Sequence, residues 1–387
     1  MLGTSKNLDY RHLQRMTDER GMLQFACGSI PDPSSGYTVD DNARALIVAL
    51  QSNWEDRTEY ALRYARFLFR AQRSEGDWCN WLLPGRGFVN DIDSDDSIGR
   101  GFLACSLGVS SDIDEELRLL CRQMVVKALS ATKNLKFPRS MAYTLIGCSR
   151  LVNDFPEYSR ESFELARRVG QNLTNLYFRN RVVYWRWFED RLTYCNAILP
   201  HALFAYYSIK SDKKTLNAAQ DSLRFLGDRL FTQGYLNVVG NRGWWVRGGE
   251  IPLFDQQPID ACSLVLACQQ AYEVTGRNEF RQMEEMAYSW YSGKNIVGMP
   301  LYNQESGGCH DALTPDGLNA NQGAEAVLSL LLSAQATDVG VNKATRKPTR
   351  ERKRFFHYSW LTRLWLILVR KQIGKLTRMA YPKGTLM

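Results

Sequence analysis

Carboxylate and amide side chains recur in this sequence at or just before the start of helices that are rich in small, uncharged residues. They are Asp40, Asp41, Asn42, Asp91, Asp93, Asp95, Asp96, Glu189, Asp190, Asn196, Asp260, Asn321 and Glu325. Asp and Asn are preferred helix caps, and a negative charge suits the positive end of the helix dipole. Capping explains one such side chain per helix, but it does not explain several together. Crowded carboxylates raise one another's pKa and are typical of sites that transfer protons.

The stretch "SSGYTVDDNARALIVAL" holds the first of these clusters. We expect Asp40 to cap the helix that begins here, and Asp41 and Asn42 to face a polar cleft. Arg44 follows the acids by about one turn, and Arg100 stands in the same relation to the second cluster. Each arginine could neutralise the acids or bind substrate hydroxyls, and the alternative is a purely structural ion pair.

Tryptophans accompany the acids in the same long loops. Their flat faces suit stacking on a sugar ring, while neighbouring carboxylates can bind its hydroxyls. Two carboxyl groups, one protonated and one ionised, can supply the acid and the base that cleave a glycosidic bond. The predicted substrate-binding residues are Asp40, Asn42, Arg44, Trp78, Trp81, Asp95, Arg100, Trp187, Asn196, His201, Trp244, Gln257, His310, Asp311 and Asn321.

Six acids are predicted to be catalytic, namely Asp41, Asp96, Glu189, Asp190, Asp260 and Glu325. Asp190 and Glu325 are the preferred pair, because Glu325 lies a turn inside its helix, where capping does not explain it. Which of the two is acid and which is base stays open. A sugar epimerase is one alternative, and His201 with His310 is its only candidate pair of proton carriers. A glycan-binding domain without catalysis is the other.

Apolar residues recur at three- and four-residue spacing, which predicts an all-α chain. Charged helices alternate with uncharged ones, as outer and inner layers would. The inner helices are expected to begin near residues 41, 96, 140, 196, 260 and 321, so that a helical hairpin repeats six times. Five outer helices lie between them, and the sixth would come from residues 8–16 or from the C-terminal tail. The pattern predicts an (α/α)6 toroid over residues 1–340, with its long loops at one face.

The basic character of the chain belongs to its C-terminal end. Residues 341–387 contain 13 Lys and Arg and one acid, whereas the rest has 36 basic and 40 acidic residues. An amphipathic helix is expected in this tail, with an apolar segment far shorter than the roughly 20 residues that span a bilayer. It could lie on an anionic membrane surface or pack on the toroid. No nucleic-acid-binding module accompanies the charge, so nucleic acid is not an expected partner.

The nine cysteines are odd in number and lack zinc-finger spacing, so we expect mostly buried free thiols in a reducing compartment. The N-terminal residues show no apolar stretch typical of a signal peptide. A cytoplasmic protein is expected, peripheral on the inner membrane surface if the tail binds lipid. "DSDD" fits an acidic motif of terpene cyclases and "GGCHD" a zinc-binding Cys–His pair, but both lack supporting residues. We expect no metal and no cofactor.

Five motifs carry a family resemblance: "MTDERGMLQFACGSIPDPSSGYTVDDNARAL", "DIDSDDSIGRGF", "FEDRLTYCNAILPHAL", "QQPIDA" and "GGCHDALTPDGLNANQGAEA". Through them, residues 8–335 resemble the six-hairpin glycosidase-like superfamily. More narrowly, the chain is similar to bacterial helical domains attached to, or encoded beside, glycosyltransferases and glycan phosphorylases. The resemblance implies the toroid fold, a sugar substrate and a glycosyltransferase partner. Most relatives of this fold invert the anomeric centre, so the resemblance implies inversion for the glycoside hydrolase that the carboxylates predict. The basic tail departs from this group.

Overall fold

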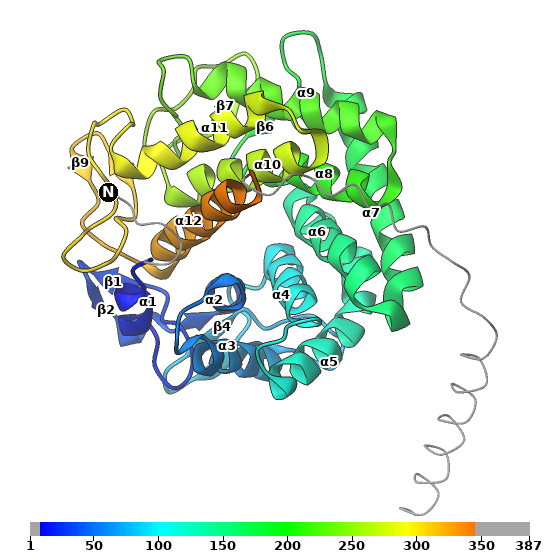
Figure 1. The fold of residues 1–387 in the computed structure, drawn as a ribbon. Helices are drawn as coiled ribbons and strands as arrows, with labels where there is room; N and C mark the ends of the chain where they lie inside the picture. Colours follow the sequence, from blue (N-terminus) through cyan, green and yellow to red (C-terminus); the bar gives the residue numbers. More distant parts are fainter. Residues whose placement is uncertain (1–7, 345–387) are drawn as a thin grey trace, which may run out of the picture. The chain divides into compact units, whose positions relative to one another are not determined.

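The computed structural model describes residues 8–344, with side chains described through residue 337. Six inner helices surround a common axis (Figure 1) and are α2 (Val39–Gln51), α4 (Asp95–Gly108), α6 (Pro138–Asp154), α8 (Ile198–Lys210), α10 (Pro258–Thr275) and α12 (Ala324–Ala344). The outer layer consists of α3 (Arg57–Ala71), α5 (Glu115–Ala131), α7 (Ser159–Asn180), α9 (Lys213–Leu230) and α11 (Asn278–Ser289). The predicted (α/α)6 toroid is confirmed, and each inner helix begins within three residues of its expected position.

The short helix α1 (Arg11–Arg15) lies where the ring closes, beside α2 and α12 (Figure 1). The Tyr10 hydroxyl lies 3.4 Å from Nε2 of Gln335, a side chain that also donates to the Val48 carbonyl. Residues 8–16 therefore contribute to the closing hairpin, as one of the two expectations had it. The compact unit ends at Lys343. The tail from residue 345, with its expected amphipathic helix, lies outside the described residues.

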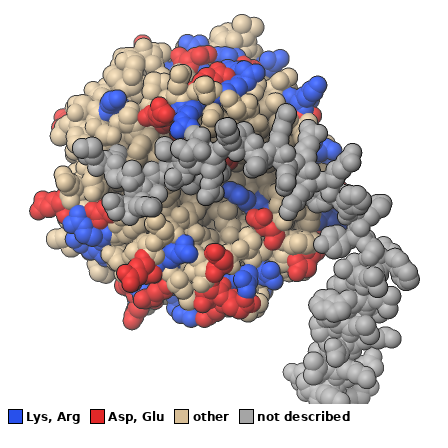
Figure 2. Space-filling model, viewed as in Figure 1, with Lys and Arg blue, Asp and Glu red and all other residues tan. Residues whose placement is uncertain are grey.

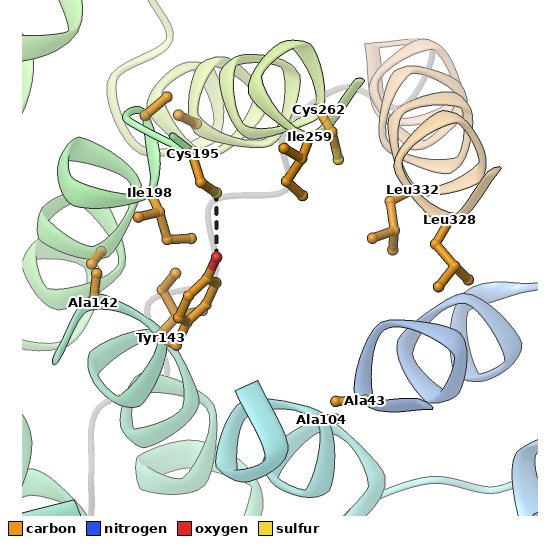
Figure 3. Close-up of a cluster of buried hydrophobic side chains, with 14 of the residues drawn as sticks. Ala43, Ala104, Ala142, Tyr143, Cys195, Ile198, Ile259, Cys262, Leu328 and Leu332 are labelled. Atoms are coloured by element: carbon orange, nitrogen blue, oxygen red, sulfur yellow. Dashed lines mark hydrogen bonds between the residues drawn. The ribbon is translucent and has the colours of Figure 1, made fainter. Parts of the chain in front are cut away.

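Small and apolar side chains from every inner helix form a buried cluster around the axis of the ring (Figure 3). Members from successive inner helices are Ala43, Ala104, Ala142, Ile198, Ile259 and Leu328. Low charge on these helices follows from their burial between the axis and the outer layer. The outer helices instead carry ion pairs on their exposed faces. On the face shown in Figure 2, basic and acidic side chains of the described residues are interspersed.

Gly99 lets α4 and α6 approach each other closely. A methyl group at its Cα would lie 2.7 Å from the Ser140 carbonyl oxygen, which belongs to backbone and cannot move freely. We expect Gly99→Ala to destabilise the fold by about 1–3 kcal/mol, as overpacking does, measured by denaturant unfolding. The matched control is Gly227→Ala on α9, where the methyl would meet only the flexible end of Met283. Equal stability of the two variants would contradict this reading of the helix contact.

Short strands join the long loops at one end of the ring. They are β1 (Ala26–Cys27), β2 (Ile30–Pro31), β3 (Tyr37–Thr38), β4 (Trp81–Leu83), β5 (Gly87–Val89), β6 (Arg191–Leu192), β7 (Trp245–Val246), β8 (Leu313–Thr314) and β9 (Gly317–Leu318). The pair β3–β4 connects the loops before α2 and α4, and β6–β7 connects the loops before α8 and α10. A bridge between Gln256 and Leu313 joins the next two loops. The loops therefore brace one another and can hold side chains in fixed positions.

Three composition-based expectations can be compared with the structure. All nine cysteines are free thiols, and eight are buried, with Cys27 exposed. No described helix combines the length and apolar character that crossing a bilayer requires. Within the described part of the chain, no group of three or more His, Cys, Asp and Glu side chains is arranged to hold a metal ion.

Candidate active site

Two adjoining cavities open among the loops that enter the inner helices. The first, of about 410 Å³, lies between the loops before α2, α10 and α12. The second, of about 720 Å³, lies between the loops before α4, α6, α8 and α10. Asp40, Arg100, Gln257 and Glu325 line both cavities. The two form one continuous cleft, with these four residues at its middle.

The first cluster of acids is arranged differently from the expectation. Thr38 caps α2 through its hydroxyl, which accepts a hydrogen bond from the Asp41 backbone N–H, so the prediction that Asp40 is the cap is wrong. Asp40 instead lines the cleft. Asn42 is fully buried and bonds the Met22 and Thr38 backbones, because the helix turns its amide towards the loop after α1. The prediction that Asn42 faces the cleft is therefore wrong.

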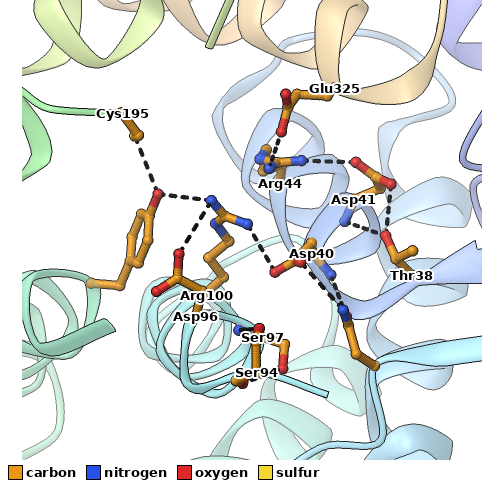
Figure 4. A network of polar contacts seen from close by, with 12 residues as sticks. Thr38, Asp40, Asp41, Arg44, Ser94, Asp96, Ser97, Arg100, Cys195 and Glu325 are labelled. Carbon is orange, nitrogen blue, oxygen red and sulfur yellow. Dashed lines mark hydrogen bonds and ion pairs between the residues drawn. The ribbon is translucent and has the colours of Figure 1, made fainter. Parts of the chain in front are cut away.

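Arg44 connects α2 to α12 (Figure 4). Its guanidinium donates to Asp41 at 2.7 Å and to Glu325 at 2.6 Å. Arg44 and Asp41 are buried, whereas the Glu325 side chain is 42% exposed and reaches into the cleft. Burial raises the pKa of Asp41 to about 6, although Arg44 and the Thr38 hydroxyl oppose the shift. Asp41 therefore holds Arg44 in place from its buried side, and Arg44 in turn positions the Glu325 carboxylate.

A second arginine binds the acids of two neighbouring helices. Arg100 lies 3.0 Å from Asp40 and 3.9 Å from Asp96, and it donates to the Tyr143 hydroxyl at 3.2 Å. Its guanidinium also stacks over the Tyr143 ring at 5.0 Å (Figure 4). Asp96 further accepts a hydrogen bond of 2.6 Å from the Tyr194 hydroxyl. Both predicted arginines thus form ion pairs with the acids, as the neutralising and the structural readings of the sequence both expected.

Arg139 organises the far side of the second cavity. It donates to Glu189 at 2.9 Å and to the Asn196 amide oxygen at 3.0 Å, and stacks over the Tyr194 ring. Asn196 is buried under this contact. Asp190, half of the preferred pair, points away from the cleft, where Arg191 lowers its pKa. The structure therefore brings Glu189 to the site, and it does not bring Asp190.

Two further acids have raised pKa values. Asp260 is fully buried and accepts the Cys195 backbone N–H at 2.7 Å; burial raises its pKa to about 7. It lies beneath the cleft and does not line it. Asp311 lines the first cavity and accepts the Gly323 N–H at 2.6 Å. Burial raises its pKa, and the nearby charge of Glu325 raises it further.

Two of the four predicted tryptophan platforms belong to the core. Trp78 and Trp187 are buried at 1% and 0% exposure, and Trp78 packs against Gly101 and donates to the Leu68 carbonyl. Trp81 donates to the Ser35 carbonyl from strand β4 and lines neither cavity. Only Trp244 lines the cleft, with its ring 6.2 Å from that of Tyr194. Trp78 and Trp187 instead pack against helices, Trp78 on Gly101 of α4 and Trp187 with its ring 6.3 Å from that of Phe225 of α9.

The predicted histidines do not reach the cleft either. His201 lies within α8, where burial lowers its pKa to about 4. The His310 ring bonds the Asn319 carbonyl through Nδ1. Neither lines a cavity, so the structure does not place them as a pair of proton carriers in the site.

Some of the remaining predicted binding residues line the cleft, and others do not. Gln257 lines both cavities, and Asp95 lines the second while accepting the Lys136 backbone N–H. Asn321 accepts the Gly28 N–H and lies outside the cleft. The sequence reading missed Arg139 and Tyr194. Arg139 follows the short loop before α6. That loop contains no acidic residue that would indicate a site in the sequence.

Comparisons with known proteins agree with the fold. No family model matches this sequence, and no curated protein matches it. A cellobiose 2-epimerase from Bacillus thermoamylovorans superposes with a TM-score of 0.67 at 10% identity, covering 87% of this chain and 96% of that one. A sugar epimerase from a ruminal bacterium gives 0.63 at 12%, covering 86% and 95%. An inactive variant of an α-1,6-mannanase from Salegentibacter sp. HEL1_6, in complex with α-1,6-mannotetrose, gives 0.59 at 14%, covering 87% and 98%. The chain thus shares the (α/α)6 toroid fold of these proteins.

Proposed function

We propose that this protein is a glycoside hydrolase that cleaves an oligosaccharide with a pair of carboxyl groups. One observation carries the proposal. Nine carboxylates and three guanidinium groups line the cleft, and no His or Lys of the described residues does. All three arginines are bound to acids of the cleft. Proton transfer at this site therefore falls to carboxyl groups, which is the chemistry of glycosidic bond hydrolysis.

Asp311 and Glu325 have the environments that suit the two roles. Both line the first cavity, and their charges interact. Burial raises the pKa of Asp311 and so favours its protonated form, whereas Arg44 holds the Glu325 carboxylate at 2.6 Å. A partly buried carboxyl group beside an ion-paired carboxylate is the combination that an acid and a base require.

The proposed reaction uses these two groups in one step. Asp311 donates its proton to the glycosidic oxygen while the bond from that oxygen to the anomeric carbon breaks. Glu325 takes a proton from a water molecule, and the water oxygen bonds the anomeric carbon. Asp40, Asp96, Gln257 and Glu189 would bind sugar hydroxyls around this point. Inversion follows if the water attacks from the opposite face.

Proton NMR of the reaction products tests the proposal. The protein would be incubated with α- and β-linked gluco-, manno- and galacto-oligosaccharides, with a uronic-acid series, and with and without phosphate. Cleavage of a neutral series supports hydrolysis, and the first anomer to appear decides between inversion and retention. Phosphate-dependent cleavage would identify a phosphorylase instead. Binding without turnover would favour the glycan-binding alternative.

A sugar epimerase is the second candidate, and the superposition on two epimerases is the observation that favours it. The positions of His201 and His310 outside the cleft speak against it. An epimerised product in the same NMR experiment would identify it.

We also propose a cytoplasmic location, a glycosyltransferase partner and contact of the tail with the inner membrane surface. The charge of residues 341–387 supports the membrane contact. Sedimentation of the full chain with anionic and with neutral phospholipid vesicles would test it.

A further inference from the structure

Two phenylalanine rings stand exposed at the cleft. Phe25, in the loop before α2, is 54% exposed and lines the first cavity. Phe137, directly before α6, is 64% exposed and lines the second. Neither ring lines the other's cavity. Large apolar side chains gain most when they are buried, so two such rings at the entrances of a polar cleft indicate a ligand that covers them.

The backbones that carry the rings are held firmly. The Phe25 N–H donates to the Ser35 hydroxyl, and its carbonyl accepts the Asp32 N–H at 2.9 Å. The Phe137 carbonyl accepts the Ser140 hydroxyl at 2.7 Å and the Met141 N–H at 3.1 Å. Rings on fixed backbones can serve as preformed platforms, because little conformational freedom is lost when a ligand stacks on them.

The proposed reacting groups lie between the two platforms. Glu325 lines both cavities, so the first cavity leads from it to Phe25 and the second leads from it to Phe137. The second cavity adds Trp244 beside Tyr194 as a further aromatic surface. A ligand that covers both phenylalanines must therefore pass over Glu325 and extend on both sides of it.

We propose that the cleft binds one oligosaccharide chain across both cavities, stacked on Phe25 at one end and on Phe137 at the other. This inference rests on the proposed function, and it specifies the substrate class as a neutral chain cleaved at an internal bond. A neutral chain fits because each arginine of the cleft is already paired with a carboxylate. An anionic sugar would meet an excess of negative charge there.

Isothermal titration calorimetry tests this in the full-length Glu325→Gln variant, which separates binding from turnover. The ligands are α-1,6-linked manno-oligosaccharides and β-1,4-linked gluco-oligosaccharides of two to six units. In the series that binds, affinity is expected to rise with length. Phe25→Ala and Phe137→Ala should each weaken binding of the six-unit chain by about tenfold, the loss of one stacked ring. Each Phe→Trp variant should restore it.

Tyr184→Ala is the matched control, because Tyr184 is also 64% exposed and lines neither cavity. It should leave the affinity unchanged. If disaccharides bind as tightly as six-unit chains, or if only one of the two Phe→Ala substitutions weakens binding, the ligand does not extend across both cavities. The proposed function stands in that case. If neither series binds at any length, the two-sided cleft fails for these neutral chains, and the NMR panel decides the proposed function separately.

Discussion

Replacing Glu325 by glutamine is expected to lower kcat for oligosaccharide cleavage by about 10²–10⁴-fold, the usual contribution of a general base. Glutamine keeps the size of the side chain and can still accept the hydrogen bond from Arg44, so folding and binding should persist. It cannot take a proton from water. The measurement is the initial rate of reducing-end formation on the series that the NMR experiment identifies, together with the calorimetric affinity.

Asp190→Asn is the matched control for this experiment. Asp190 was the sequence-based partner of Glu325, but its side chain is 59% exposed and pairs with Arg191 outside the cleft. Its substitution should change kcat by less than twofold. A large loss in Asp190→Asn, or near-normal turnover in Glu325→Gln, would show that the roles are assigned to the wrong residues.

The acid role of Asp311 has its own signature in the same assay. A general acid assists departure of the leaving group. Asp311→Asn should therefore lower kcat strongly on oligosaccharides and only slightly on aryl glycosides, whose phenolate leaving groups depart without a proton. Glu325→Gln should lower kcat to the same extent on both kinds of substrate. The same loss on both substrates in Asp311→Asn would remove Asp311 from the acid role.

Burial of Asp260 is expected to make the folded protein less stable as pH rises from about 4 to about 7. The pKa of this carboxyl is about 7 in the folded chain against an ordinary value of 3.8. Over that interval the folded state retains a proton that the unfolded state releases, so the free energy of unfolding falls as pH increases. The loss amounts to about 4 kcal/mol, at about 1.4 kcal/mol per pKa unit.

Urea unfolding of the wild type and of Asp260→Asn at pH 5 and pH 8 measures this contribution. Asparagine can still accept the Cys195 N–H, and it has no charge to bury. The variant should therefore lose less stability than the wild type between the two pH values, by about 2–3 kcal/mol. Asp190 lies on the surface, so Asp190→Asn should not reduce the change in the free energy of unfolding between the two pH values. If wild type and Asp260→Asn change in parallel, Asp260 does not titrate in this range.

The arrangement of the helices could be predicted from the sequence because it depends on periodic burial. Inner helices such as α4 and α10 carry few charges over their whole length, and this distinguishes them from outer helices. The position of the cleft followed from the same reasoning, since long loops must collect where the inner helices begin. Arg44 and Arg100 were also found, because their spacing of about one turn from an acid is a local property.

The direction of individual side chains could not be predicted. Glu189 faces the cleft and its neighbour Asp190 faces solvent. Both lie in an irregular bend just before strand β6, where no periodicity fixes the direction of a side chain. Loop composition was equally ambiguous for aromatic residues. Trp78 and Trp187 looked like platforms beside acids, but their rings pack against helices α4 and α9. The exposed rings are Phe25 and Phe137, which no acidic motif marks.

The Arg44–Glu325 contact joins residues that are 281 positions apart in the chain. His12 bonds the Gln322 carbonyl across 310 positions, and Gln335 bonds the Val48 carbonyl across 287. During synthesis, α2 is therefore complete long before its neighbour α12 exists. Contacts of such high sequence separation form late and slow the folding of a chain. The proposed base would be set in place only when the last hairpin docks, so a nascent or truncated chain would hold the sugar-binding loops without the group that activates water.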